Sequence, residues 1–168
     1  ARSKVVHEVG GRSLMGHVIG VAEAAGAALS VVVTGHDGEA VAAEASVHAA
    51  NFAHAVQDTP MGTGHAVAAA LAAVDALATF DGDVIVVFGD TPLLRTENFA
   101  ALQGARAAGA CVAVLGFVPD DPAAYGRHVV SGELAPGVHG LEAIVEFKEA
   151  NEEQRAIDFC NGGAMLIE

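Results

Sequence analysis

Hydrophobic positions follow two alternating patterns along the chain up to Val118. Apolar, β-branched runs predict strands over Leu29–Thr34 and Val84–Phe88, the latter buried on both faces, and shorter or mixed apolar segments predict strands over Phe52–Gln57 and Ala110–Val118. Between them, Ala-rich segments with apolar residues at helical spacing predict helices over Ser13–Ala27, Glu39–Ser46, Gly64–Leu77 and Thr96–Ala108, with Ser13 and Thr96 as caps. Such strand–helix alternation is typical of an α/β protein. We therefore expect a Rossmann-like, three-layer α/β/α fold with a mostly parallel sheet.

The pattern changes after Asp120, where the segments become shorter and richer in turn residues. The expected elements are an antiparallel pair around Val129 and over Leu141–Phe147, a short helix over Glu149–Arg155, and a last strand over Phe159–Ile167 broken by Asn161-Gly162-Gly163. The prediction is one domain with a small antiparallel portion, in which the first part binds a nucleotide and the second faces the other substrate.

Composition narrows the possible partners. The chain has 8 Lys and Arg against 21 Asp and Glu, a formal net charge of −13, and it contains no Trp and only one Tyr. This balance argues against binding to nucleic acid, which needs basic and aromatic surfaces. A phosphorylated substrate would need a locally placed cation to offset the acidic field.

The two cysteines, Cys111 and Cys160, lie far apart without Cys-x-x-Cys spacing. They are expected to be small buried hydrophobes in a reducing cytoplasm. The eight histidines lack ligand spacing, so a histidine zinc site is not expected. No apolar run reaches the roughly 18–20 residues needed to cross a bilayer, and no signal peptide is visible, so no membrane association is expected.

The strand Val84–Phe88 leads directly into Gly89-Asp90-Thr91-Pro92. Gly89 allows another group to approach the backbone closely, and the proline ends the strand. Asp90 is thereby placed at the carboxyl edge of the sheet, where open α/β folds bind ligands. A lone carboxylate there suits a divalent cation shared with a phosphorylated substrate, although Asp before Thr-Pro is also ordinary turn chemistry.

A second motif, Gln57-Asp58-Thr59-Pro60-Met61-Gly62-Thr63-Gly64-His65-Ala66, joins a strand to a helix. A glycine turn here can expose backbone N–H groups to a phosphate or a base edge, or can simply connect the two elements. The motif is neither a Walker loop nor a dinucleotide fingerprint. Further along, the N–H of Gly126, the carboxylate of Glu146 and the amide of Asn161 are candidate contacts to a sugar, with exposed turns as the alternative.

The order of these motifs, including Lys4-Val5-Val6-His7, Tyr125-Gly126-Arg127 and Val145-Glu146-Phe147-Lys148-Glu149-Ala150, resembles the sugar-nucleotide pyrophosphorylases over essentially the whole chain. The resemblance is strongest to the uridylyltransferase domains of bacterial bifunctional N-acetylglucosamine-1-phosphate uridylyltransferase/acetyltransferases. It implies a nucleotide-diphospho-sugar transferase fold. It also implies attack by N-acetylglucosamine 1-phosphate on UTP, giving UDP-N-acetylglucosamine and pyrophosphate.

The resemblance also implies roles for individual residues. Lys4 would contact phosphate as a catalytic cation, and Asp90 would hold Mg²⁺. The nucleotide would be bound by Lys4, Gln57, Gly62, Thr63, Phe88, Gly89 and Asp90. The sugar would be bound by Gly126, Glu146 and Asn161.

The family pattern extends beyond these 168 residues. Its Gly-rich phosphate loop, second metal ligand and C-terminal left-handed β-helix domain have no counterpart here. We therefore expect residues 1–168 to be a partial domain that is inactive alone, from a cytoplasmic parent that forms a homotrimer. The alternatives are another sugar-phosphate or cofactor nucleotidyltransferase, or a catalytically silent nucleotide-sugar-binding module.

Overall fold

The computed structural model describes residues 3–35, 38–59, 61–74 and 80–168, and it divides the chain into two compact units. The first unit comprises Ala1–Ala101 and the second Leu102–Glu168. The boundary falls inside a helix rather than at the change of sequence pattern after Asp120. Three sequence features lie outside the described residues: His36-Asp37, Pro60 and the last residues of the helix expected to reach Leu77.

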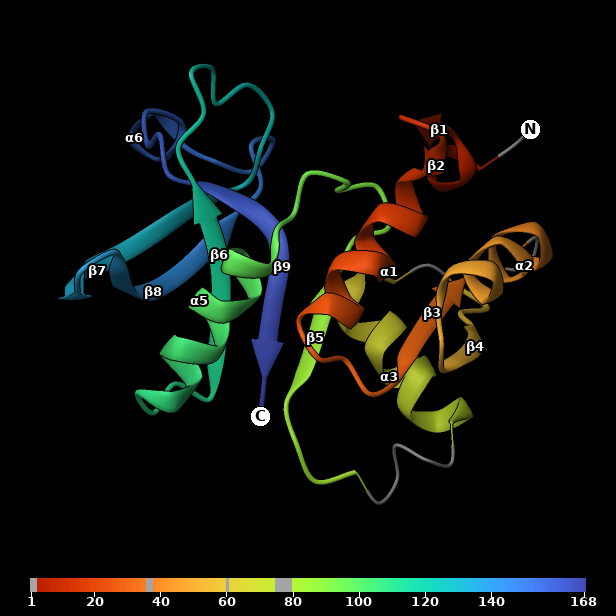
Figure 1. Ribbon diagram of the computed structural model, residues 1–168. Helices are drawn as coiled ribbons and strands as arrows, with labels where there is room; N and C mark the ends of the chain where they lie inside the picture. Colours follow the sequence, from red (N-terminus) through yellow and green to blue (C-terminus); the bar gives the residue numbers. More distant parts are fainter. Residues whose placement is uncertain (1–2, 36–37, 60, 75–79) are drawn as a thin grey trace. The chain divides into compact units, whose positions relative to one another are not determined.

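The first unit alternates helices with strands (Figure 1). Its elements are η1 (Lys4–Val6), β1 (Glu8–Val9), β2 (Arg12–Ser13), α1 (Leu14–Ala24), β3 (Ser30–Thr34), α2 (Glu39–His48), β4 (Phe52–Val56), α3 (Thr63–Ala73) and β5 (Val84–Val87). Strands β3 and β4 pair in parallel from Ser30↔Phe52 to Thr34↔Val56. The N–H of Gln57 continues this ladder by donating to the Thr34 carbonyl at 2.7 Å, which places Gln57 at the carboxyl edge of the pair.

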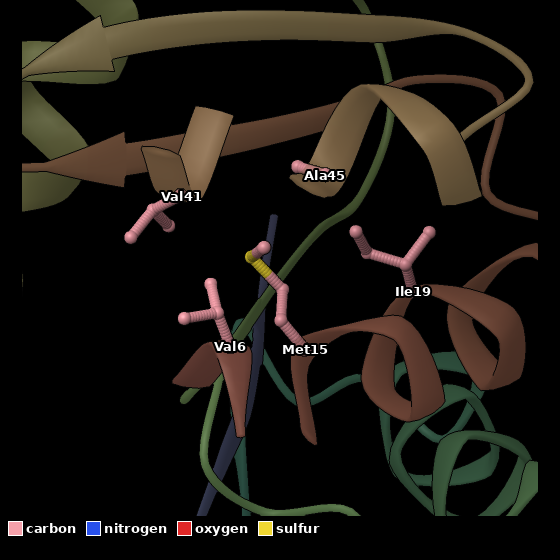
Figure 2. Close-up of a cluster of buried hydrophobic side chains, with 5 residues drawn as sticks. All are labelled: Val6, Met15, Ile19, Val41 and Ala45. Atoms are coloured by element: carbon pink, nitrogen blue, oxygen red, sulfur yellow. The ribbon is translucent and has the colours of Figure 1, made fainter. Parts of the chain in front are cut away.

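The core of the first unit lies where α1, α2 and η1 meet (Figure 2). Met15 and Ile19 of α1 and Val41 and Ala45 of α2 are each four residues apart, so each pair lies on one face of its helix. Figure 2 shows these four side chains converging with that of Val6. Burying a valine, isoleucine or methionine side chain contributes about 1.5–3 kcal/mol to stability. Lys4, two residues before Val6 in η1, therefore lies close to a packed core.

The second unit is built around antiparallel strands. It contains the end of α5 (Thr96–Ala107), then β6 (Val112–Phe117), β7 (Arg127–Ala135), β8 (Val138–Val145), α6 (Glu152–Arg155) and β9 (Cys160–Ile167). Strands β7 and β8 form a hairpin that pairs Val129 with Ala143, β6 pairs with β9, and β7 meets β9 at Arg127↔Cys160. Figure 1 shows the β7–β8 hairpin and α6 in this unit.

The α/β class and the expected antiparallel pair are confirmed. Ser13 caps α1 as predicted, because its Oγ accepts from the Gly16 N–H at 3.0 Å. Thr96, by contrast, is the first residue of α5 rather than its cap. The last strand is continuous, because Asn161-Gly162-Gly163 is absorbed by an irregularity in the β6–β9 register instead of breaking it.

Two further features differ from the sequence prediction. The β1–β2 hairpin was not expected, although Gly10-Gly11 between Val9 and Arg12 is a typical hairpin turn. Both cysteines are free, but only Cys160 is buried, and Cys111 is exposed. Cys111 precedes β6, whose first residue Val112 is itself 55% exposed, so the apolar run begins outside the core.

Candidate functional site

The first part of the candidate site is an ion pair between Lys4 and Asp90. Asp90 follows β5 in a turn that Thr91 closes by donating its hydroxyl to the Phe88 carbonyl at 2.7 Å. Gly89 allows η1 to approach this turn, because a Cβ built on Gly89 would lie 3.3 Å from Cγ1 of Val5. The close approach expected from Gly89 is thus observed. It brings Lys4, the neighbour of Val5, onto the carboxylate of Asp90.

The Lys4–Asp90 ion pair and the neighbouring Phe88 are accessible to solvent. The side chains of Lys4 and Asp90 are 77% and 31% exposed, and Phe88 beside them is 41% exposed. Among the described residues, no cluster of three or more His, Cys, Asp or Glu forms a cation cage. A single carboxylate suits an ion that takes most of its ligands from water and substrate phosphates, as Mg²⁺ commonly does.

The second part of the site is the turn between β4 and α3. Gly62, at the N-cap of α3, has φ 90°, a left-handed conformation that favours glycine. No side chain caps this helix, so N–H groups of its first turn remain available to a ligand. Thr63 is the first residue of the helix.

The amide of Gln57 has a defined orientation in this turn. Its Nε2 lies 3.2 Å from the Gly62 carbonyl oxygen and 2.9 Å from Nδ1 of His65. The carbonyl can only accept, so the amide nitrogen of Gln57 must face it, and Nδ1 of His65 then acts as a second acceptor. No described residue donates to Oε1 of Gln57, which remains an open hydrogen-bond acceptor.

A separate candidate site in the second unit gathers three residues that are distant in sequence. The Asn161 N–H donates to the Gly126 carbonyl at 2.9 Å. A Cβ built on Gly126 would lie 3.3 Å from Oε1 of Glu146. Glu146 also lines a cavity of about 330 Å³ together with Ala124 and residues 147–149. The structure therefore brings together Gly126, Glu146 and Asn161, the residues that the resemblance assigns to the sugar.

Three residues near these groups were missed by sequence reasoning: His65, Arg127 and His128. Arg127 and His128 open β7 and are each 2% exposed. Burial lowers the pKa of His128 below its ordinary value of 6.5, opposed by a side-chain hydrogen bond with Asn161. The only available signal was position. Arg127 and His128 directly follow Gly126 and begin a strand that is buried on both faces at this end.

The fold resembles that of a UDP-glucose pyrophosphorylase. The chain is similar to the crystal structure of UDP-glucose pyrophosphorylase complexed with UDP-glucose, with a TM-score of 0.73 and 16% identity over 98% of this chain and 67% of that one. The structure of HddC from Yersinia pseudotuberculosis is also similar, with a TM-score of 0.68 and 14% identity over 98% and 67% of the two chains. At this level of identity the likeness concerns the fold alone.

The sequence identifies the family. Residues 1–154 match the MobA-like NTP transferase domain, and the chain belongs to this nucleotidyltransferase family. It is 44% identical over 164 residues to "Bifunctional protein GlmU" of Azorhizobium caulinodans, covering 98% of this chain and 35% of that protein. It is 42% identical over 168 residues to the protein of the same name from Sinorhizobium medicae, covering 100% of this chain and 35% of that protein. The chain thus spans about a third of the length of these relatives.

None of the described helices is long and apolar enough to cross a membrane.

Proposed function

We propose that this chain forms most of a uridylyltransferase domain, which transfers UMP from UTP to N-acetylglucosamine 1-phosphate. The first unit carries the proposed nucleotide contacts, Lys4, Gln57, Gly62, Thr63, Phe88, Gly89 and Asp90. The second unit carries the proposed sugar contacts, Gly126, Glu146 and Asn161. Support comes from the NTP transferase family and from relatives named "Bifunctional protein GlmU" at 42–44% identity.

The observation that carries the proposal is the orientation of the Gln57 amide. With Nε2 directed at Gly62 and His65, only the acceptor Oε1 is available to a base. Uracil presents its N3–H as a donor, and the backbone N–H groups of the Gly62–Gly64 turn can serve its carbonyl oxygens. Cytosine and adenine present an unprotonated ring nitrogen at the corresponding edge, so they would face Oε1 with a second acceptor.

The proposed reaction needs alignment and charge neutralisation but no covalent intermediate with the protein. A phosphate oxygen of N-acetylglucosamine 1-phosphate forms a bond to the α-phosphorus of UTP. The bond from that phosphorus to the bridging oxygen of the β-phosphate breaks, and pyrophosphate leaves. Holding the two reactants in line is itself a large source of rate enhancement.

Lys4 and Asp90 have complementary tasks in this proposal. Mg²⁺, when bound, would neutralise charge on the UTP phosphates. The Asp90 carboxylate has the charge and donor type that such an ion requires. Lys4 is exposed and adjacent to Asp90, so its ammonium group can exchange the carboxylate for a phosphate oxygen of the nucleotide.

The test is pyrophosphate release by the full-length parent protein, assayed with Mg²⁺ against a panel of nucleoside triphosphates and sugar 1-phosphates. We expect the highest kcat/KM for UTP with N-acetylglucosamine 1-phosphate. A clear preference for another pair would identify a different nucleotidyltransferase. Binding of UDP-N-acetylglucosamine in calorimetry without any turnover would instead identify a silent sugar-nucleotide-binding module.

We extend the proposal to the parent protein. It would complete this domain, add a C-terminal β-helix acetyltransferase domain acting on glucosamine 1-phosphate, and work as a cytoplasmic homotrimer. Residues 1–168 alone would then be inactive. These statements rest on the resemblance and on the word "Bifunctional" in the relatives' name. Size measurement and acetyl-transfer assays on the parent protein test them.

A further inference from the structure

Arg127 is a buried cation whose contacts converge on one loop. The residue is buried, with only 2% of its surface exposed. Nη1 donates to the carbonyl oxygens of Pro122, at 3.2 Å, and Tyr125, and Nη2 donates to that of Ala123 at 3.1 Å. The guanidinium therefore ties together the loop that immediately precedes Gly126.

This loop contains a strained residue. Ala123 has φ 37°, and it is the only non-glycine residue with positive φ in the described part of the chain. Such a conformation costs roughly 1–3 kcal/mol and persists only where surrounding contacts impose it. The bond from Arg127 to the Ala123 carbonyl is one of these contacts, and the Ala123 N–H donates to Asp121 Oδ1 at 2.9 Å.

Arg127 also reaches the neighbours of the two other proposed sugar contacts. Its Cζ lies 5.4 Å from the ring centroid of Phe147, which follows Glu146. Its Nη1 lies 3.8 Å from Sγ of Cys160, which precedes Asn161. Each proposed sugar contact therefore has a sequence neighbour in this cluster. Gly126 is next to Arg127 itself, and Glu146 and Asn161 are next to residues that Arg127 contacts.

The charge of Arg127 has no carboxylate partner among the described residues. Ion pairs among the described residues join Lys4 to Asp90, His48 to Glu44 and Arg106 to Glu168, and Arg127 takes part in none of these three. A buried charge is costly unless hydrogen bonds satisfy it. Here backbone carbonyl oxygens and an aromatic face surround the guanidinium, a planar group suited to holding several acceptors in fixed directions. The carbonyl oxygens accept from Nη1 and Nη2, whereas the buried Nε has no hydrogen-bond partner among the described residues.

We propose that Arg127 is a positioning residue for the proposed sugar contacts. It holds the Gly126 loop, Glu146 and Asn161 in the arrangement that binds the sugar 1-phosphate. This inference rests on the proposed function for the identity of that ligand. It predicts that replacing Arg127 raises the KM for the sugar 1-phosphate and leaves the KM for the nucleotide nearly unchanged.

Arg155 supplies a matched control. Its Cζ lies 5.1 Å from the centroid of the same Phe147 ring, and its Nε donates to the Phe147 carbonyl at 3.3 Å. Arg155 is exposed, however, and has no contact with the loop of residues 122–125 among its described interactions. Arg155→Met therefore removes an arginine from Phe147 without releasing the Gly126 loop.

The experiment compares Arg127→Met, Arg127→Lys and Arg155→Met in the full-length parent. It measures KM for N-acetylglucosamine 1-phosphate and for UTP, together with hydrogen exchange of residues 122–127 and 146–149. Arg127→Met should raise the sugar-phosphate KM roughly ten- to hundredfold, since small misplacements of positioning groups cost that much. The UTP KM should stay within about twofold, and exchange should rise in these two segments. Arg127→Lys should show the same effects in smaller measure, and Arg155→Met should leave both KM values within about twofold.

Equal increases in both KM values, or an unchanged sugar-phosphate KM, would overturn the inference. Should Arg127→Met fail to fold, the same criteria apply to Arg127→Lys. If the unaltered parent does not turn over the substrate pair, the proposed function fails by itself. Hydrogen exchange then decides on Arg127: a rise confined to residues 122–127 and 146–149 supports its positioning role, and unchanged exchange refutes it.

Discussion

Replacing Asp90 with Asn distinguishes what the Lys4–Asp90 ion pair contributes to stability from what the Asp90 carboxylate contributes to activity. The substitution preserves shape but removes the charge that pairs with Lys4. Both side chains are accessible, at 77% and 31% exposure, and exposed ion pairs contribute at most about 1 kcal/mol to stability. For a protein of this size, such a loss lowers the Tm by less than about 4 °C. We therefore expect Asp90→Asn to fold almost normally.

The expected loss of activity is much larger. A carboxylate and a cation about 4 Å apart near a protein surface interact by about 4 kcal/mol. Losing that interaction where charge develops on phosphate corresponds to roughly a thousandfold fall in kcat/KM. The two expectations thus differ by about 3 kcal/mol, a gap that thermal unfolding and kinetics resolve easily.

The assay is pyrophosphate release by the full-length parent at several Mg²⁺ concentrations, with Lys4→Met as the matched control. Both variants break the same ion pair, so they should lose the same small amount of stability. Only Asp90→Asn removes a candidate metal ligand, so only that variant should require more Mg²⁺ for half-maximal rate. Turnover within tenfold of normal in Asp90→Asn, with an unchanged Mg²⁺ requirement, would refute the metal role.

Three more predictions concern the other parts of the site. His65→Phe leaves the Gln57 amide held by the Gly62 carbonyl alone, so the kcat/KM preference for UTP over CTP should fall roughly five- to tenfold, the worth of one hydrogen bond; an unchanged preference would show that His65 does not orient the amide. The pKa of His128 is lowered in the folded state, so the unfolded chain takes up the proton first. Stability should be full above pH 6.5 and decline below it by at most about 1.4 kcal/mol per pH unit, a slope that urea unfolding should find reduced in His128→Gln. Gly126→Ala places a Cβ 3.3 Å from Oε1 of Glu146, and it should raise KM for the sugar phosphate several-fold; an equal rise in KM for UTP would argue against a local effect.

The elements of the first unit could be predicted because their signals are local. β-Branched runs predicted β3 and β5 to within a residue, the short segment Phe52–Gln57 predicted β4, and Ser13 marked the start of α1. The second unit was harder. A pair of glycines after Asn161 reads as a break, yet β9 continues because the partner strand β6 takes up the irregularity between Val114 and Gly116. That compensation depends on a strand about 50 residues away and leaves no local trace.

The candidate site, too, was predictable only where its residues carry a local sequence signal. The order of motifs indicated Asp90, Gln57 and Gly126, because their residue types and flanking glycines are visible in the sequence. The groups that hold them in place were not visible. His65 faces Gln57 across a helix start, and Arg127 reaches back to carbonyl oxygens of the loop before it. Backbone acceptors have no sequence signature, so an arginine that binds them cannot be told from a surface arginine before the fold is known.

The acidity of the chain gives the Lys4–Asp90 pair a significance beyond its small contribution to stability. With a net charge of −13, the protein repels a nucleoside triphosphate at long range. Lys4 alone cannot offset this field while its charge is balanced by Asp90. A divalent cation arriving with the nucleotide would satisfy Asp90 and release Lys4 to the phosphates, so that two positive groups replace one neutralised pair. Nucleotide affinity should therefore depend on the divalent cation more steeply in the unaltered protein than in Asp90→Asn, in which Lys4 is already free.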